Sequence, residues 1–257
     1  MCRLLAVKSA EPTTLEYYML HAPVPFVSYG NKRNPHGWGI AWYEEGRPQL
    51  FKDPHQASTS RTLPALSAEA VSTMLVSHLR KASPGLPIYR RNCHPFVYDN
   101  WAFAHNGTIH EIKAWRDRLQ PKFSSAITGT TDSEVYFLSL LQAIEKRSGD
   151  VVAGIRDVTT KLRKFNSANF LLTDGARLFA YRNSTQKPHH FSLSYRCVKR
   201  PAPAQTKKTR QPAATDTPQI PHVVVCSNRL TKSGWRPIPL RHLLVVEADC
   251  STCIVKM

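Results

Sequence analysis

The chain has 257 residues, of which 42% are hydrophobic; this length and composition suit a soluble globular protein with one large domain or two small ones. Its formal net charge of +17 would suit nucleic acid, an anionic membrane surface or an acidic small molecule as a partner. No apolar run approaches the roughly 20 residues that cross a bilayer, and charged residues interrupt the first 20 positions. The sequence therefore predicts no membrane association and no secretory signal, and a cytoplasmic location is expected.

Part of the positive charge lies in residues 198–221, a segment rich in Pro, Ala, Thr and Lys. This segment has too few apolar residues to offset the entropy of ordering its backbone, so it is predicted to be a mobile basic insertion between strands. The sequence shows no aromatic–basic platform of the RNA-binding kind. Nucleic-acid binding is therefore not expected as the main function.

A strand is predicted directly after Met1, in CRLLAVKS, and a short helix in TTLEYYMLH with Thr13 or Thr14 as its cap. The next strand, HGWGIAWYE at 36–44, contains two glycines, which indicate that another group approaches its backbone closely. Two further buried strands are predicted in STMLVSHLR and NWAFAHNG.

Two helices are expected after these strands. In TDSEVYFLSLLQAIEK, residues 131–146, Thr131 and Glu134 have the spacing of a capping box, and the apolar residues repeat at about the helical period. The second helix is predicted in DVVAGIRDVTTKLRKF.

Six short strands follow, in NFLLT, ARLFAYR, FSLSYR, HVVVCS, LLVVE and CIVK, and Asp174-Gly175 is expected to join the first two as a hairpin. The predicted order is strands, then a pair of helices, then strands again. This order lacks the regular alternation of strands and helices that is typical of a parallel sheet. The sequence therefore predicts an α+β fold, with two antiparallel sheets and helices packed outside them. Residues 2–257 show no internal repeat or domain boundary, so a single domain is expected.

The six cysteines lie at scattered positions in a chain that is not short, so a disulfide framework is not expected. Cys250 and Cys253 form a C-x-x-C pair, but a structural zinc site would normally show a second such pair. Because the pair lies between two strand-like runs, we expect it at a hairpin turn, and no metal is predicted.

Cys2 is the first candidate for chemistry. Removal of Met1 by an aminopeptidase would leave Cys2 with a thiol and a free α-amino group on one residue. An α-amino group has a pKa of about 7.7–8.0 and a free thiol about 8.5, so a base near operating pH would stand beside a nucleophile. The alternative is a small buried residue at the start of a strand.

The stretch FAHNGTI, residues 103–109, has three interpretations. Asn106-Gly107 between apolar runs is typical of a tight hairpin turn. Asn106-Gly107-Thr108 would be a glycosylation sequon only in a secreted chain. A side-chain amide next to a backbone N–H could also bind the oxyanion of an acyl-transfer reaction. Taken alone, this stretch favours the turn over the oxyanion site.

The motifs, taken in order, resemble those of the type 2 glutamine amidotransferase domain, the class II family of N-terminal nucleophile hydrolases. The resemblance is carried by Cys2 and by GWG at 37–39, SHLRKASPG at 77–85, NCHPF at 92–96, FAHNG at 103–107 and TDSE at 131–134. The resemblance has specific motifs from residue 2 to about residue 146, and it continues more loosely to the C-terminus. The chain is most similar to stand-alone members such as the glutathione-degrading and ergothioneine-pathway amidohydrolases. The resemblance implies a four-layer αββα sandwich without a cofactor or a metal.

The resemblance implies that Cys2 attacks the γ-amide carbonyl of the substrate to form a γ-glutamyl thioester. Asn106 and Gly107 match the oxyanion hole of the family, through the side-chain amide of the first and the backbone N–H of the second. Such donors act by stabilising the charge that develops on the carbonyl oxygen.

Arg80 matches the family residue that binds the substrate α-carboxylate, and Asp132 matches the partner of its α-ammonium group. Taken singly, Arg80 could be a solvated charge and Asp132 an acid favoured by the helix dipole. Ser83 could also bond the carboxylate, although Ser83-Pro84 replaces the Thr-His pair of many synthase-linked members. His94 has no catalytic assignment, and a packed histidine is favoured over a base.

The expected function is hydrolysis of a γ-glutamyl amide, either glutamine or a larger γ-glutamyl compound, to glutamate and an amine or ammonia. The expected partner is the small-molecule substrate. Two alternatives stay open: a non-catalytic or regulatory glutamine-binding protein of the same fold, and an ammonia-donating subunit that works with a separate synthase.

Overall fold

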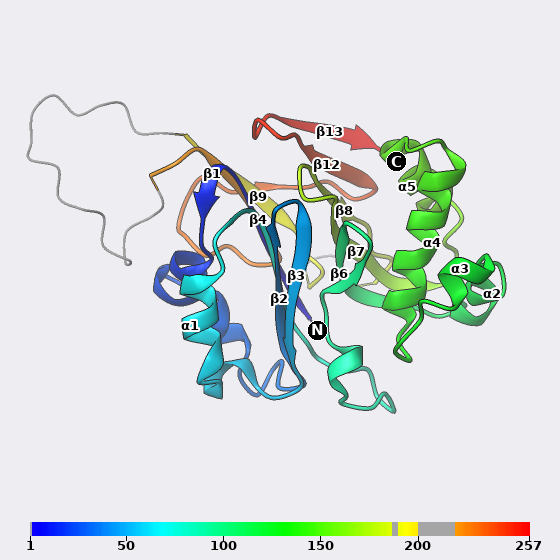
Figure 1. Ribbon diagram of the computed structural model, residues 1–257, viewed down its shortest axis with the longest axis horizontal. Helices are drawn as coiled ribbons and strands as arrows, with labels where there is room; N and C mark the ends of the chain where they lie inside the picture. Colours follow the sequence, from blue (N-terminus) through cyan, green and yellow to red (C-terminus); the bar gives the residue numbers. More distant parts are fainter. Residues whose placement is uncertain (1, 187–189, 200–218) are drawn as a thin grey trace, which may run out of the picture.

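The computed structural model describes residues 2–186, 190–199 and 219–257. Two antiparallel sheets lie face to face, with α1 on the outer side of one and α4 and α5 on the outer side of the other (Figure 1). The architecture is therefore α+β with four layers in the order αββα, and the predicted fold class is confirmed.

The first sheet has seven strands in the order β11-β9-β10-β1-β4-β2-β3. Its strands are β1 (Arg3–Thr13), β2 (Trp38–Glu44), β3 (Arg47–Asp53), β4 (Ser72–Leu79), β9 (Ser194–Val198), β10 (His222–Cys226) and β11 (Arg236–Pro237). The N-terminal strand β1 lies in the middle, between β10 and β4. Cys2 therefore lies at the end of a central strand, where neighbouring strands can supply groups from both sides.

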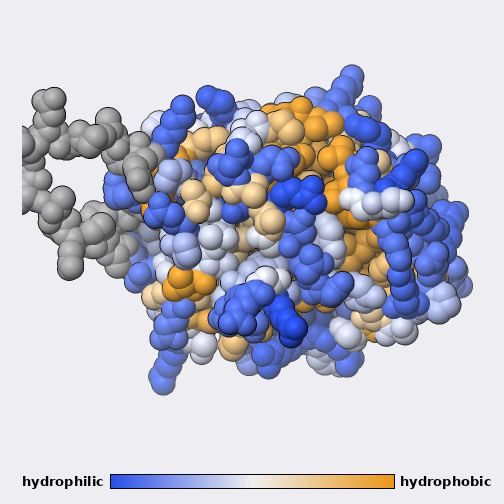
Figure 2. Space-filling model, turned by 45° about the horizontal axis from the view of Figure 1, so that its top comes forward, coloured by the Kyte–Doolittle hydropathy of each residue, from blue (hydrophilic) through white to orange (hydrophobic). Residues whose placement is uncertain are grey.

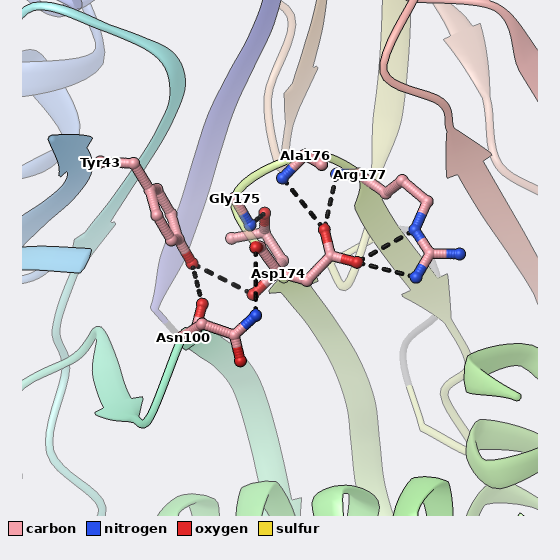
Figure 3. Close-up of polar contacts among 7 residues, drawn as sticks. Tyr43, Asn100, Asp174, Gly175, Ala176 and Arg177 are labelled. Atoms are coloured by element: carbon pink, nitrogen blue, oxygen red, sulfur yellow. Dashed lines mark hydrogen bonds and ion pairs between the residues drawn. The ribbon is translucent and has the colours of Figure 1, made fainter. Parts of the chain in front are cut away.

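The second sheet has six strands in the order β13-β12-β8-β7-β6-β5. Its strands are β5 (Phe96–Tyr98), β6 (Trp101–Ile109), β7 (Phe165–Thr173), β8 (Leu178–Arg182), β12 (His242–Val246) and β13 (Thr252–Lys256). The predicted hairpin at Asp174-Gly175 is confirmed between β7 and β8. Asp174 holds this turn by accepting hydrogen bonds from the backbone N–H groups of Ala176 and Arg177 and by pairing with the Arg177 guanidinium (Figure 3).

The two sheets are also joined by a polar contact beside this hairpin. The hydroxyl of Tyr43, on β2, lies 2.9 Å from the carbonyl oxygen of Asn100 and 3.2 Å from that of Thr173 (Figure 3). Its one proton is thus shared between an acceptor in the turn between β5 and β6 and one at the end of β7. A buried hydroxyl with such partners links the two layers without an unpaired polar atom.

The described residues form five α-helices: α1 (Thr62–Glu69), α2 (Ile112–Arg116), α3 (Pro121–Ser124), α4 (Asp132–Lys146) and α5 (Val151–Thr159). Four shorter helical turns are η1 (Tyr17–His21), η2 (Phe26–Tyr29), η3 (Ala57–Thr59) and η4 (Arg90–Asn92). The structure confirms the two predicted helices, as α4 and α5. The helix predicted in TTLEYYMLH is confirmed only as the turn η1, because Thr13 pairs with Ser72 at the end of β1.

Alternating strand residues fill three apolar clusters. On β1, Leu4 and Ala6 pack between the two sheets, whereas Leu5 and Val7 pack on the outer face of the first sheet. Successive strand residues point to opposite faces, so a strand covered on both sides is apolar throughout. The third cluster lies between the second sheet and α4 and α5.

The turn predicted at Asn106-Gly107 is wrong. β6 continues through both residues to Ile109, with Asn106 opposite Asn169 and Gly107 opposite Ala168 on β7. A Cβ atom on Gly107 would lie 1.7 Å from the Ser167 carbonyl oxygen. The glycine is therefore required by the close approach of β7, a reason that sequence alone does not distinguish from a turn.

The C-x-x-C pair lies at a hairpin, as predicted. Cys250 is in the turn between β12 and β13 with a φ of 66°, and Cys253 is in β13. The predicted insertion at 198–221 connects β9 and β10, which are neighbours in the first sheet, but its residues 200–218 lie outside the described part of the chain.

Hydrophilic side chains alternate with apolar areas on the face of the molecule seen in Figure 2. Among the described residues, the helices are all too short or too polar to span a bilayer.

Candidate active site

Cys2 lies where the start of β1 meets the end of β4. Arg3 is paired with Leu79, which brings the residues after β4 beside the cysteine. The Lys81 backbone N–H donates to Cys2 Sγ at 3.3 Å, and the thiol faces the Lys81 carbonyl oxygen at 3.5 Å. Burial raises the pKa of the Cys2 thiol, whereas the Lys81 hydrogen bond and the charge of Arg80 lower it. The thiol therefore needs a nearby base to become a nucleophile at neutral pH.

Asn106 supplies a hydrogen-bond donor beside this thiol. Its side chain is almost fully buried, and in the described part of the chain its Nδ2 atom has no hydrogen-bond partner. Leaving a buried donor unpaired costs about 1–3 kcal/mol, so an unpaired donor at a pocket wall marks a place for an external acceptor. Asn106, Gly107 and Cys2 line the same pocket, and the pairing of β6 with β7 fixes the backbone of the first two.

Arg80 is a buried cation that pairs with no carboxylate of the described residues. Only 2% of its surface is exposed, and its guanidinium donates long hydrogen bonds to the carbonyl oxygens of His36 (3.4 Å) and Pro87 (3.3 Å). None of the ion pairs among the described residues includes Arg80. Burying an unpaired charge is costly, and a planar guanidinium binds a carboxylate well. Arg80 is therefore suited to hold the carboxylate of a bound molecule.

Asp132 is the first residue of α4, and its carboxylate reaches away from the helix. Its Oδ2 accepts a hydrogen bond of 2.7 Å from the Ile109 N–H at the end of β6. Within the described part of the chain, its Oδ1 has only a long contact with the Ser133 hydroxyl, at 3.4 Å, which leaves capacity for another donor. The carboxylate is thus anchored to the strand that carries Asn106, rather than serving only the helix dipole.

Two polar side chains hold the loop before α4. Glu134 accepts hydrogen bonds from the backbone N–H groups of Thr128 and Gly129, at 3.0 and 2.7 Å. Asn92 exchanges two hydrogen bonds with Thr130, at 2.9 and 3.1 Å. These bonds connect the segment after β4 with the loop that presents Asp132. Sequence reasoning missed this role of Asn92 and Glu134, although both belong to the motifs NCHPF and TDSE.

The capping box at the start of α4 is therefore only half formed. The Thr131 hydroxyl accepts the Glu134 N–H at 3.3 Å, as predicted. The Glu134 carboxylate binds the preceding loop instead of the Thr131 N–H, because Thr128 and Gly129 offer it three donors.

Three histidines lie buried beneath the site. The rings of His94 and His78 pack in a tilted arrangement with centroids 4.2 Å apart, and among the described residues neither nitrogen of His94 has a partner. Burial lowers the pKa of His94 well below its usual value and that of His78 to about 3. His105 Nδ1 lies 2.9 Å from the Ser133 hydroxyl, and burial lowers its pKa too. All three rings are therefore neutral at neutral pH.

The glycines of GWG allow close packing next to the site, as predicted. A Cβ atom on Gly37, whose φ is +119°, would lie 2.5 Å from Cys93 Sγ, and one on Gly39 would lie 2.3 Å from the His94 carbonyl oxygen. Burial raises the pKa of Cys93 to about 11 and that of Cys226 to about 12. These two thiols are therefore protonated at neutral pH.

The predicted site residues line two adjoining pockets. Cys2, Ser83 and Gly107 line both of them. Arg80 and Asp132 line the smaller pocket, of about 20 Å³, and Asn106 lines the larger, of about 180 Å³. The structure thus brings together Ser83 and the five residues that the resemblance matches.

An αββα sandwich with a cysteine at the end of a central strand is the architecture of an N-terminal nucleophile hydrolase. The family profile described as "Glutamine amidotransferases class-II" matches residues 1–254, and the chain belongs to this family.

Three similar proteins show the range of the family. The chain is 25% identical to the probable glutamine amidotransferase DUG3 of Saccharomyces cerevisiae, over 96% of this chain and 82% of that protein. It is 24% identical to the γ-glutamyl-hercynylcysteine sulfoxide hydrolase of Mycobacterium tuberculosis, over 70% and 76% of the two chains. The solved structure of glutamine phosphoribosylpyrophosphate amidotransferase from B. subtilis superposes with a TM-score of 0.67 at 16% identity, over 99% of this chain and 49% of that chain. This last likeness confirms the fold.

Proposed function

We propose that the protein hydrolyses γ-glutamyl amides through a γ-glutamyl thioester on Cys2. The observation that carries this proposal is the buried Nδ2 of Asn106, which no group of the described residues pairs with, in the pocket that Cys2 lines. An amide donor kept free beside a thiol suits an oxyanion better than a neutral ligand, because the developing charge strengthens the hydrogen bond. Membership of the class II amidotransferase family supports the same chemistry.

The smaller pocket would bind the amino-acid end of the substrate. Arg80 would pair with the α-carboxylate and Asp132 Oδ1 with the α-ammonium group, while Ser83 lines the same pocket. Two opposite charges at fixed positions require a ligand that carries both complementary charges, since an analogue without one leaves a buried charge unpaired.

The reaction would proceed in two halves after removal of Met1. The α-amino group of Cys2 takes the thiol proton, and the sulfur attacks the γ-carbonyl carbon. The oxyanion is held by Asn106 Nδ2 and the Gly107 N–H; the C–N bond then breaks, and the amine leaves with the proton. A water molecule next adds to the thioester, the C–S bond breaks, and glutamate and the free thiol are formed.

The experiment measures glutamate release by the parent protein and by Asn106→Ala. We expect kcat to fall about 10²–10³-fold with a smaller change in KM, because the lost donor acts mainly on the transition state. A parent-like kcat in Asn106→Ala would contradict the proposed oxyanion hole.

The substrate side is tested with L-glutamine and N-acetyl-L-glutamine. The acetyl group removes the positive charge that Asp132 would bind, so the acetylated compound should be turned over at least about 10²-fold more slowly. Comparable rates would contradict the role of Asp132. The intact mass of the purified protein shows whether Met1 has been removed, which the proposed base requires.

A further inference from the structure

A cavity of about 650 Å³ lies where the end of α5 meets the starts of β7 and β12 and the end of β13. Its walls come from the segments 159–165, 181–185 and 240–241 and from Met257, and α5 lies beside the end of β13 (Figure 1). In the described part of the chain, none of its lining residues also lines a pocket at Cys2. Phe165 lines this cavity, whereas Asn166, the next residue of β7, lines the larger pocket at Cys2. Because successive strand residues face opposite sides, the cavity is a separate site.

Ser184 supplies a buried hydroxyl at the wall of this cavity. Only 8% of its surface is exposed, and among the described residues its Oγ has no hydrogen-bond partner. A backbone bridge to Ser167 on β7 holds its main chain in place. A buried polar group without a partner is costly, so an unpaired hydroxyl at a cavity wall indicates a place for a polar group of a bound molecule.

Two arginines make the cavity positively charged. Arg163 follows α5 and Arg241 precedes β12; both are exposed, and no ion pair among the described residues includes either of them. The described lining residues include no Asp or Glu. Burial raises the pKa of the Tyr181 hydroxyl, whereas two hydrogen bonds and the charge of Arg241 lower it, so this charge acts inside the cavity. The cavity is therefore suited to an anion.

Apolar side chains form another part of the wall. Leu162 and Phe165 are buried there, whereas Leu240 is 40% exposed, which is a large share for a leucine beside a cavity. A ligand with an apolar part would cover Leu240 and remove its surface from water. Pockets for drug-sized ligands start at about 300 Å³, so this cavity has room for a molecule the size of a nucleotide.

We propose that this cavity is a second ligand site, which binds an organic phosphate monoester whose apolar part has about the size of a nucleoside. Such a phosphate carries about −1.5 to −2 charges at pH 7, which suits two guanidinium groups better than the single charge of a carboxylate. The Ser184 hydroxyl binds a polar atom of the ligand, and Phe165 and Leu240 contact its ring. No bond is made or broken in this site, so the proposal does not depend on hydrolysis at Cys2.

Isothermal titration calorimetry with AMP, adenosine and inorganic phosphate tests the parts of the site separately. We expect one AMP to bind per chain, at least about 10-fold more tightly than adenosine or phosphate alone, because only AMP engages both the arginines and the apolar wall. Added salt should weaken the binding of AMP more than that of adenosine, because exposed charges are screened.

Arg163→Gln and Arg241→Gln should each weaken AMP binding about 3–5-fold, as expected for exposed charge pairs, and should leave adenosine binding unchanged. The matched control is Lys164→Gln, which removes the same charge at the neighbouring position. Lys164 pairs with Glu111 at 3.0 Å and does not line the cavity, so this variant should keep the parent affinity for AMP.

Two further variants test the hydroxyl and the apolar wall. Ser184→Ala should weaken AMP binding several-fold, whereas the free energy of unfolding of the ligand-free protein should not fall, because the described residues offer the lost hydroxyl no partner. Leu240→Ala, at an exposed position, should weaken the binding of AMP and adenosine by the same factor.

Absence of AMP binding would overturn the proposed site, as would equal affinities of the parent protein for AMP and adenosine. An equal loss of AMP affinity in Lys164→Gln and Arg163→Gln would also overturn it, because binding would then follow net charge rather than the cavity. None of these results bears on glutamate release, which tests the hydrolysis at Cys2 separately.

Discussion

The Lys81 backbone N–H lies 3.3 Å from Cys2 Sγ, although 79 positions separate the two residues. The contact follows from strand pairing, since Arg3 at the start of β1 is opposite Leu79 at the end of β4. β6 of the other sheet adds Asn106 and Gly107 to the same pocket. The site thus forms where ends of strands from both sheets meet.

Cys2→Ser should lower glutamate release by more than about 10³-fold, because the oxyanion hole and substrate binding alone retain only a small part of the catalysis. Circular dichroism should show the parent fold. Cys93→Ala and the exposed Cys253→Ser are the controls, and both should stay within a few-fold of the parent rate. Parent-like turnover by Cys2→Ser would exclude Cys2 as the nucleophile.

Sequence patterns predicted the elements with strong apolar periods, such as α4, and the motifs that meet at the site. They missed β3, whose sequence RPQLFKD has no clear alternation and which pairs only with β2 at the sheet edge. They also missed α1, α2 and α3, which are short. The hydrogen bonds between Asn92 and Thr130 join residues 38 positions apart, and a local sequence pattern cannot predict such a pairing.

Two roles are predicted for Gly107, a turn and an oxyanion donor, and the structure replaces the turn with a close approach of β7. Gly107→Ala should therefore lower the free energy of unfolding by several kcal/mol, since its Cβ would meet a backbone carbonyl rather than a flexible side chain. The control is Gly46→Ala, with a φ of +76° and open space around it, which should cost about 1–2 kcal/mol from backbone strain alone. Urea unfolding of both variants measures the difference, and equal losses would count against the steric explanation.

Glu134→Ala should release the loop that presents Asp132. Three hydrogen bonds to Thr128 and Gly129 would be lost, so the loop before Asp132 would be held less firmly, although Asp132 Oδ2 would keep its hydrogen bond from the Ile109 N–H. We expect KM for glutamine to rise about 10-fold with a smaller change in kcat, because substrate binding is affected more than the thiol chemistry. Glu145→Ala, which removes an exposed ion pair on the same helix, should leave KM unchanged. A KM in Glu134→Ala equal to that of the control would show that the loop is held by other contacts.

The buried histidines predict how stability depends on pH. His78 has a pKa of about 3 in the folded protein, whereas an unfolded histidine has about 6.5, and burial lowers the pKa values of His94 and His105 as well. The unfolded chain therefore binds more protons below pH 6.5, and the free energy of unfolding falls as the pH falls. Each histidine contributes a slope of about 1.4 kcal/mol per pH unit between pH 6.5 and its folded pKa.

Urea unfolding at pH 7.5, 6.5 and 5.5 measures this slope. His78→Gln removes one titrating ring and should reduce the loss between pH 6.5 and 5.5 by about 1 kcal/mol relative to the parent protein. His55→Gln is the matched control, because its ring is exposed and its hydrogen bond is to Asp53 at the surface, and it should keep the parent slope. The same slope in His78→Gln and the parent would mean that His78 is protonated, or accessible to protons, in the folded protein.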